Sequence, residues 1–489
     1  MPEPSAPARE QQITYNRRYV GTKETVAYLF NDVSNAFNIG GYNDRFIWDV
    51  VGIDFKVTAA VNMLTGAWDV INDAIAAVLV DRTRTRWGKF RPYILGLQIP
   101  LTLLGILYWF TPLFFPGSAP AYLPKLIYHF ALGVVRETGD TFKNIAKGGY
   151  MSTITPNPDE RGRLIMLAEL LSGYMGEDLP GVFMGVLIDL VNNGIVPWKL
   201  SSLFIAMGAG TAVVSSALSY WFVVITRERV MQRVDHPSIR EGLRAVINNK
   251  PVLMILLSGL LGGFSIGVGR GNYFIDVLGM ASLDTIINLP SSFNGSISYA
   301  FVQPLRRRFS SKSLWVFEDI YTRSLTIIVF LLGLPNRNYE KRLFMSILFG
   351  AQAFMDKWMF GIRKVINAEL YNEAMDYCEW KNGYRVEATT SVAIDLVRKI
   401  QGILMSSVYQ LVMSRIGYVQ QRAIGTQSDN TKRWLFAMCT GVPALTSALG
   451  VIPKFFYPLT REMRTQMYNE LHQRRSDTAR EVNEGAAVT

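Results

Sequence analysis

Long apolar stretches recur along this chain, and they limit the folds available to it more than any other feature. Residues 107–115, 203–225, 252–269 and 325–334 contain no charged side chain. Several of these stretches approach the ~20 residues that cross a lipid bilayer as a helix. They are too numerous for one soluble core, and only 18% of the 489 residues are charged, against about 25% in average soluble proteins. The sequence therefore predicts an all-α polytopic membrane protein.

Lysine and arginine gather in alternate loops. Basic residues are frequent at 82–91, 161–163, 227–250, 306–312 and from 454 onward, whereas the intervening loops 116–125, 191–199 and 277–284 hold few. Positively charged loops stay in the cytoplasm, so we expect a multi-pass protein of the cell (plasma) membrane with both termini cytoplasmic. The same placement accounts for the net charge of +11 without a nucleic-acid partner.

Turn and charge patterns divide the chain into twelve predicted transmembrane helices, six on each side of a long basic linker. The predicted spans are 24–50, 55–81, 93–114, 122–153, 163–191, 199–226, 251–278, 283–305, 313–334, 339–368, 385–415 and 432–453. This layout is typical of the major facilitator fold, which has two six-helix bundles. We therefore predict an N-terminal tail (1–22), an N-terminal bundle (23–226), a linker (227–250), a C-terminal bundle (251–456) and a C-terminal tail (457–489).

Three polar residues interrupt the second apolar span on one helical face. Asp69 and Asp73 are one turn apart and Asn72 lies between them. An acid inside a membrane is costly and is a functional hypothesis by default. Carboxylate and amide oxygens suit a hard cation such as sodium, and two close carboxylates can instead hold a proton. The alternative is a static ion pair with basic residues of another helix.

The fourth span carries a ladder of charged residues that includes Arg136, Asp140, Lys143 and Lys147. Arg136 and Asp140 have the spacing of an intrahelical pair. Lys143 and Lys147 share one face, and two interpretations of them remain open. They attract an anionic group of a substrate, or they balance Asp69 and Asp73.

Catalytic patterns are missing from the sequence. The three histidines are far apart, no HExxH or P-loop motif occurs, and the two cysteines have no metal-like spacing. We therefore expect no enzyme and no cofactor.

Three segments carry a resemblance to a known family. The stretch WDVINDAIAAVLVDRTRTRWGKFRPYIL (68–95) resembles the second helix and following loop of the glycoside–pentoside–hexuronide:cation symporter family, which includes the melibiose carriers. DYCEWKNGYRVE (376–387) resembles the family's loop before helix eleven, and Tyr457-Pro-Leu-Thr with Glu470-Leu471 resembles its tail. The matches are in order and span nearly the whole chain.

The resemblance implies a cation site and a substrate site. In sodium-coupled members, two aspartates and an asparagine of helix two bind the cation with a threonine of helix four, and these positions are matched by Asp69, Asn72, Asp73 and Thr141.

The substrate site departs from the family pattern. Asp32 falls near a helix-one aspartate that contacts sugar, and Lys399 matches a helix-eleven lysine near both sites. The family's main sugar aspartate of helix four aligns with Asn144, close to Lys147, and an expected arginine of helix five is absent from 164–171. The cation set is thus complete while the sugar set is altered.

The basic loop after the second span is expected to act as a cytoplasmic gate. Asp81, Arg82, Arg86 and Arg91 can bridge to neighbouring helix ends when that side closes. The loop also serves as a topology determinant.

Together these features predict a secondary active transporter that moves a sugar or glycoside with sodium or a proton by alternating access. Its expected partners are the small-molecule substrate and membrane lipid, the coupling ion is its only cofactor-like group, and it is expected to be monomeric. An organic anion such as a uronate is the alternative cargo. A non-transporting membrane sensor or scaffold on the same fold is the alternative of another class, although costly buried acids argue against it.

Overall fold

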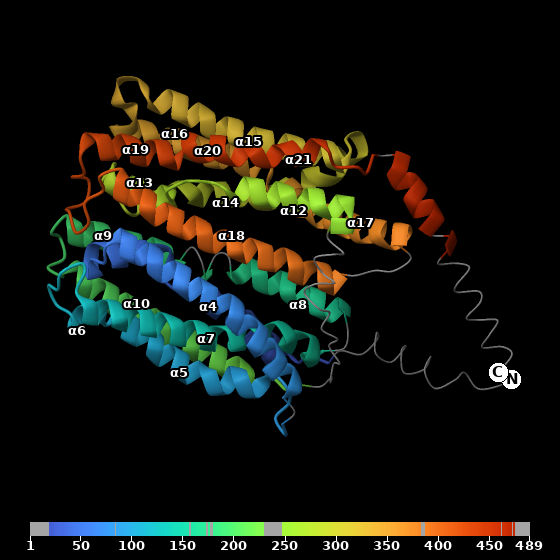
Figure 1. The fold of residues 1–489 in the computed structure, drawn as a ribbon, viewed down its shortest axis with the longest axis horizontal. Coiled ribbons are helices and arrows are strands. Elements are labelled where there is room, and N and C mark those ends of the chain that lie inside the picture. Colours follow the sequence, from blue (N-terminus) through green and yellow to red (C-terminus); the bar gives the residue numbers. More distant parts are fainter. Residues whose placement is uncertain are drawn as a thin grey trace. The chain divides into compact units, whose positions relative to one another are not determined.

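The computed structural model describes residues 19–474 apart from 84, 156–157, 173–174, 177–178, 229–246, 383–386, 461 and 472. Most of the predicted linker 227–250 therefore lies outside the described residues, as do parts of both predicted tails. The described residues form helices and connecting loops, with one isolated bridge between Thr85 and Gly88 (Figure 1). The predicted all-α class is confirmed.

The chain folds into two compact units, of which the first comprises 1–234, 274–285 and 410–431. In this unit α10 packs on α2 and α5, α7 packs on α4 and α5, and α2 packs on α8. Its helices are α2 (Thr22–Ala36), η1 (Gly40–Tyr42), α3 (Asn43–Arg45), η2 (Phe46–Val51), α4 (Phe55–Arg82), α5 (Arg91–Trp109), α6 (Thr111–Phe114), α7 (Leu123–Ile154), α8 (Pro158–Leu171), α9 (Leu179–Asn192) and α10 (Leu200–Ile225).

Helix α4 shows how the local sequence sets an element that crosses a membrane. Gly52 (φ +65°) ends η2 in a left-handed conformation, and the Asp54 carboxylate then accepts the Lys56 backbone N–H at 2.8 Å to cap α4. The helix buries small residues such as Ala76, while Leu64 and Ile71 are 60% and 56% exposed. Large apolar side chains on an outer face are what a helix in lipid presents.

Four helical stretches are long and apolar enough to cross a membrane: 55–80, 91–109, 200–225 and 429–455. Two shorter apolar helices, α9 and α12 (Lys250–Gly263), fall below that length. The full number of twelve transmembrane helices stays a prediction.

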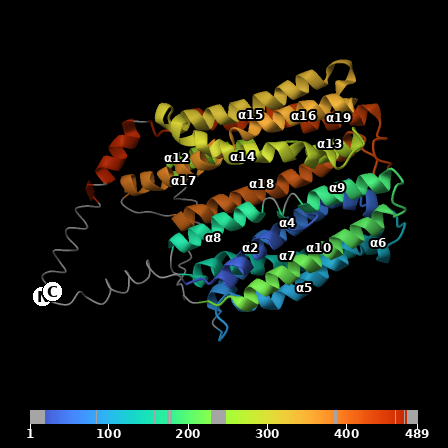
Figure 2. The ribbon, with the colours of Figure 1, turned by 180° about the vertical axis from the view of Figure 1, so that it is seen from behind.

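The second compact unit comprises 235–273, 286–409 and 432–489. The elements after α12 belong to this unit apart from residues 274–276, 283–285, 410–415 and 429–431, which belong to the first. They are shown from two sides in Figures 1 and 2. They are α13 (Arg270–Asp276), α14 (Leu283–Arg308), α15 (Ser311–Gly333), η4 (Pro335–Glu340), α16 (Arg342–Lys357), α17 (Phe360–Asn382), α18 (Glu387–Arg415), α19 (Asp429–Cys439), α20 (Gly441–Ser447), η5 (Ala448–Gly450) and α21 (Val451–Phe455). The predicted bundle boundaries, 23–226 and 251–456, stay a prediction.

The predicted seventh span is not one continuous helix. Residues 264–269 are non-helical between α12 and α13. A Cβ on Gly267 would lie 3.0 Å from the Met438 carbonyl oxygen, and the Val268 N–H donates to that same oxygen at 2.9 Å. The glycine therefore permits a close backbone approach that a continuous helix would prevent.

Candidate functional site

The polar face of α4 meets α7. The Thr141 hydroxyl donates to Asp69 Oδ1 at 3.2 Å, and both residues are buried. The Asn72 side chain is 2% exposed and donates to the Thr138 carbonyl at 3.4 Å, and Asp73 is half-buried one turn after Asp69. The structure thus places Asp69 of α4 in contact with Thr141 of α7, two of the four residues predicted to form one cation site.

Small and hydroxyl side chains set the approach of these two helices. Trp68 Nε1 donates to Thr138 Oγ1 at 2.9 Å. A Cβ on Gly133 would lie 3.5 Å from the Thr65 methyl group, which is ordinary contact. An alanine at 133 would therefore fit without displacing the two helices.

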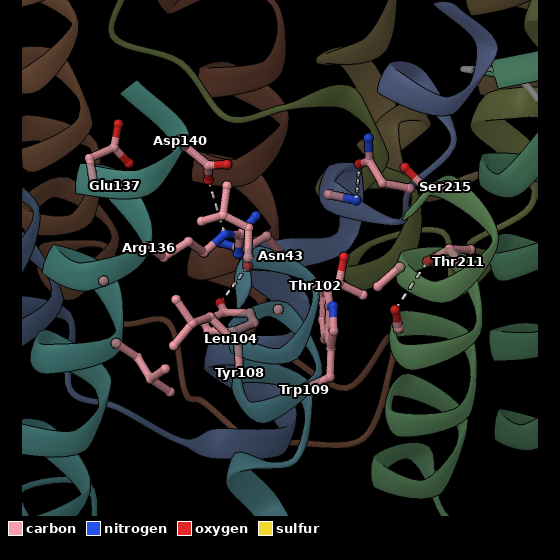
Figure 3. Close-up of a pocket in the computed structure, with 18 of the residues that line it drawn as sticks. Asn43, Thr102, Leu104, Tyr108, Trp109, Arg136, Glu137, Asp140, Thr211 and Ser215 are labelled. Carbon is pink, nitrogen blue, oxygen red and sulfur yellow. Dashed lines mark hydrogen bonds and ion pairs between the residues drawn. The ribbon is translucent and has the colours of Figure 1, made fainter. Parts of the chain in front are cut away.

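A polar cavity of about 990 Å³ lies in the first unit (Figure 3). Residues of α2, α4, α5, α7 and α10 line it, and Thr65 and Asp140 belong to its wall. Asp69 follows Thr65 by one helical turn, and Thr141 follows Asp140 directly, so the Asp69 site and the cavity share both helices.

One part of the cavity wall carries the predicted substrate residues of α7. Asn144 is exposed to the cavity, and the Lys147 ammonium donates to the Asn35 side-chain oxygen. Lys143, Asp140 and Asp32 are the charged neighbours of Lys147. Asp32 therefore lies in the electrostatic surroundings of the cavity, although it is not among the wall residues.

Lys399, the remaining predicted substrate residue, lies half-buried on α18 in the second unit. Lys399 does not line the cavity of the first unit, and its role in substrate binding stays a prediction.

Another part of the wall contains a cation beside aromatic and amide groups (Figure 3). The Arg136 guanidinium lies 3.4 Å from Asp140 Oδ2 and 5.9 Å from the Tyr108 ring centre. The Tyr108 hydroxyl donates to Asn43 Oδ1 at 2.5 Å. Sequence reasoning anticipated the Arg136–Asp140 pair but missed Tyr108, whose predicted span 93–114 carries no charged residue.

The predicted gate loop is held within the first unit by one carboxylate that the sequence reasoning missed. Glu228 accepts the backbone N–H groups of Lys89, Phe90 and Arg91 at 2.8–2.9 Å. Arg91 in turn donates to the Val223 carbonyl at 3.1 Å. A search for charged motifs does not find such a contact, because the donors are backbone N–H groups and not charged side chains.

Two other predicted gate residues lie at the surface. Arg82 and Arg86 are exposed, with Arg86 over the Trp87 ring, and the Asp81 side chain lies outside the described residues. A gating role for this loop stays a prediction.

A buried ion cluster, missed by sequence reasoning, lies elsewhere in the first unit. Arg45 contacts Asp276 Oδ2 at 2.6 Å, Asp49 Oδ2 at 2.7 Å and the Tyr418 hydroxyl at 2.7 Å. The side chains of the three charged residues are 2–8% exposed. We call these four residues the Arg45 cluster. Its members are 373 positions apart in sequence at most, so no local motif marks it.

A second carboxylate pair lies in the second unit, beyond the predicted end of span ten. Glu369 contacts Arg306 at 2.5 Å and also Arg464, and Glu373 contacts Arg464 at 2.6 Å. Burial raises the pKa of Glu373 to about 7, with Arg464 opposing the rise and Glu369 adding to it. The contact holds the tail helix at 462–471, whose Met467 and Leu471 are buried in the same unit.

Comparison with known proteins identifies relatives over nearly the whole chain. The profile of the family described as MFS/sugar transport protein matches residues 27–461. An uncharacterized symporter, YjmB of Bacillus subtilis, is 26% identical over 92% of this chain and 95% of its own. The glucuronide carrier protein homolog of Escherichia coli is 22% identical over the same shares. A putative sulfoquinovose importer of Salmonella typhimurium is 25% identical over 88% of each chain.

Solved structures support the fold. The nucleoside transporter NupG matches with a TM-score of 0.54 at 11% identity, over 91% of this chain and 98% of its own. A D-xylose–proton symporter matches with a TM-score of 0.51 at 12% identity, over 90% and 98%. The predicted major facilitator fold is thereby confirmed.

Proposed function

The chain belongs to the MFS/sugar transport protein family, a family of membrane transporters and not of enzymes, and from this premise we propose that it is a cation-coupled symporter of a sugar or sugar acid. Asp69, Asn72, Asp73 and Thr141 bind the coupling cation, which is sodium or a proton. The substrate binds in the adjoining cavity near Asn144 and Lys147. The loaded protein then exposes both ligands to the cytoplasm by alternating access.

The contact between Thr141 and Asp69 is the observation that carries this proposal. It supplies a buried carboxylate and a hydroxyl from two helices, with the Asn72 amide beside them. Oxygen donors of this kind are the ligands that hard cations prefer. Because both helices also form the cavity wall, an ion that draws them together stabilises the shape of the substrate site. Reciprocal coupling of the two affinities follows by linkage.

Cation-dependent uptake tests the proposal. Cells or vesicles expressing the protein are offered a labelled sugar acid with and without a sodium or proton gradient. Asp73→Cys removes one ligand, and cation-dependent uptake is expected to disappear. Retention of sodium or proton dependence in this variant contradicts the site.

The hydrogen bonding of one cavity lysine favours an anionic sugar over a neutral one. Arg136, Lys143 and Lys147 line the wall, against the carboxylates Glu137 and Asp140. Arg136 pairs with Asp140, and Lys147 donates only to a neutral amide among its described hydrogen bonds. An ammonium held by a neutral partner gains more from a substrate carboxylate than one already neutralised. Relatives named as carriers of glucuronide and sulfoquinovose support the same direction.

A comparison of thermal stabilisation by the two substrate classes tests this preference. Thermal stabilisation of the purified protein is measured with a uronate, with its neutral parent glycoside, and with each in the presence of sodium at two pH values. We expect larger shifts with the uronate. Equal shifts with both compounds contradict the anionic preference while leaving cation coupling intact.

A further inference from the structure

We propose that the Arg45 cluster is a second gate, and that its closed state holds one proton between the carboxylates of Asp49 and Asp276. This inference goes beyond the proposed function, because it concerns residues outside the cation site and the substrate cavity. Proton binding and gate closure can also be measured without substrate.

The cluster fixes two segments that the chain connects to the second unit. Asp276 lies in 274–285 and Tyr418 in 410–431, both of which belong to the first unit, whereas the residues before and after each segment belong to the second. Arg45, from α3, contacts both. A transporter that alternates must release such segments when this end opens.

Two further contacts hold the same segments. The Asp189 carboxylate, from α9, accepts the backbone N–H groups of Ala281 and Ser282 at 2.6 and 2.9 Å. The Gln420 amide donates to the Ile53 carbonyl at 2.7 Å. Trp48 and Phe55 pack against the Tyr418 ring at 5.4 and 5.7 Å between ring centres. Aromatic rings therefore pack against Tyr418 of the cluster, and further hydrogen bonds, including those to the Asp189 carboxylate, hold the same segments.

Loop charge places this gate on the outer side. The loop 277–284 is poor in basic residues, which predicts an extracellular position. The predicted cytoplasmic loop 83–91 lies at the other end of α4. The two loops thus serve opposite gates.

The buried charges do not balance. In the described part of the chain, Arg45 is the cation that contacts Asp49 and Asp276, so two carboxylates face one guanidinium. The Tyr418 hydroxyl supplies a neutral donor, and Lys125 of α7 donates instead to the carbonyls of Val51 and Gly52 at 3.0 and 3.1 Å. An uncompensated charge in such a site is costly. One proton on the pair makes the closed cluster neutral.

Hydrogen bonding assigns the proton to Asp49. Asp276 Oδ2 accepts from Arg45 at 2.6 Å and from the Tyr418 hydroxyl at 3.1 Å, and both bonds stabilise its ionised form. Asp49 Oδ2 lies 2.7 Å from Arg45 Nη2, but that nitrogen is poorly aligned and makes no hydrogen bond. Closing the gate therefore takes one proton from solvent onto Asp49, and opening it releases that proton.

The test measures access from outside the cell. Cys378 and Cys439 are replaced by alanine, and Thr102→Cys places one thiol in the cavity wall. A membrane-impermeant thiol reagent is applied to intact cells at pH 5.5 and pH 8. Each rate is divided by that of a solvent-exposed thiol at the same pH, because the reactive thiolate fraction itself rises with pH. We expect this relative rate to be roughly tenfold higher at pH 8, since loss of the proton leaves unbalanced charge and opens the gate.

Two variants and a control make the result specific. Asp49→Asn mimics the protonated acid and should give a low relative rate at both pH values, whereas Arg45→Gln should give a high relative rate at both. Asp54→Asn removes a carboxylate from the neighbouring helix cap and should keep the pH dependence of the parent. Size-exclusion profiles confirm that each variant folds. The proposal is overturned if Asp49→Asn keeps the parent's pH dependence, or if Arg45→Gln labels as slowly as the parent at pH 5.5.

Discussion

Two pairs of acids in the first unit differ in what surrounds them. Asp69 accepts from the hydroxyl of Thr141, with Asn72 and Asp73 on the same helix face. Asp49 and Asp276 instead flank Arg45, and the charged side chains of that cluster are nearly inaccessible. The first pair is drawn from two helices that also form a cavity, whereas the second ties distant segments of the chain.

The comparison shows that the groups next to two carboxylates determine whether the pair can bind a cation or forms a structural contact. Neutral oxygen partners such as the Thr141 hydroxyl add ligands for a cation. A guanidinium neutralises one carboxylate in a fixed geometry and turns the pair into a structural contact whose remaining charge is met by a proton. We therefore assign coupling to the Asp69 site and closure to the Arg45 cluster.

The largest effect is expected when the Asp69 site loses charge. Asp69→Asn keeps the shape of the side chain but removes a buried anionic ligand, so cation-coupled uptake should fall by about 100-fold, the equivalent of about 2.7 kcal/mol. Initial uptake rates under an imposed gradient measure this. Asp54→Asn, at the start of the same helix, is the matched control and should transport normally. Similar losses in both variants would remove the distinction between the two regions.

The next effect separates the cavity from the ion site. Lys147→Gln should weaken binding of a uronate by roughly 10- to 100-fold, because a charge-assisted hydrogen bond to a buried ligand contributes about 1.5–3 kcal/mol. Binding of the neutral parent glycoside should change little. Titration calorimetry with both compounds checks this, with the exposed Lys199→Gln as control. An equal loss for both ligands would mean that Lys147 supports the fold and not the substrate carboxylate.

A smaller effect is expected at Thr141, the α7 residue that donates to Asp69 of α4. Thr141→Ala removes one neutral oxygen, worth about 1 kcal/mol, and should raise the concentration of cation for half-maximal uptake by about fivefold. Thr141→Ser retains the hydroxyl and should restore the affinity. If Thr141→Ser loses as much cation affinity as Thr141→Ala, the packing of the Thr141 methyl group matters and its hydroxyl does not.

The smallest effect extends the comparison to the acid pair of the second unit. The pKa of Glu373 rises from 4.5 in the unfolded chain to about 7 in the fold, so the folded protein retains a proton that the unfolded chain has released. Stability should therefore fall as the pH rises from about 4.5 through 7. Glu373→Gln should weaken this dependence: the change in unfolding midpoint between pH 5 and pH 8 should be smaller by about 1–2 °C than in the parent. An unchanged slope in the variant would place the titrating group elsewhere.

Much of the fold follows from patterns that act locally. Apolar length and basic loops predict an all-α membrane protein because burial in lipid and positive-inside topology depend on short windows of sequence. The break at 264–269 was not predicted, since it depends on a backbone contact between Gly267 and Met438, which are distant in the chain. Composition alone would extend the helix through this apolar stretch.

The candidate site was predictable where its residues share a helix face. Asp69, Asn72 and Asp73 follow from spacing, whereas Thr141 required the family resemblance, because nothing in α7 alone singles it out. The Arg45 cluster and Glu228 escaped prediction for a different reason. Arg45, Asp276 and Tyr418 meet only after folding, and Glu228 binds backbone amides that carry no sequence signature.

Gradient-driven accumulation in proteoliposomes tests the central claim most directly. The purified protein is reconstituted, a sodium or proton gradient is imposed, and the internal concentration of a labelled uronate is followed in the parent and in Asp69→Asn. The account predicts accumulation above the external concentration with one of the two gradients, its collapse when an ionophore dissipates that gradient, and no accumulation in Asp69→Asn. Accumulation by Asp69→Asn equal to that of the parent, or uptake by the parent that never exceeds equilibrium under either gradient, would contradict it.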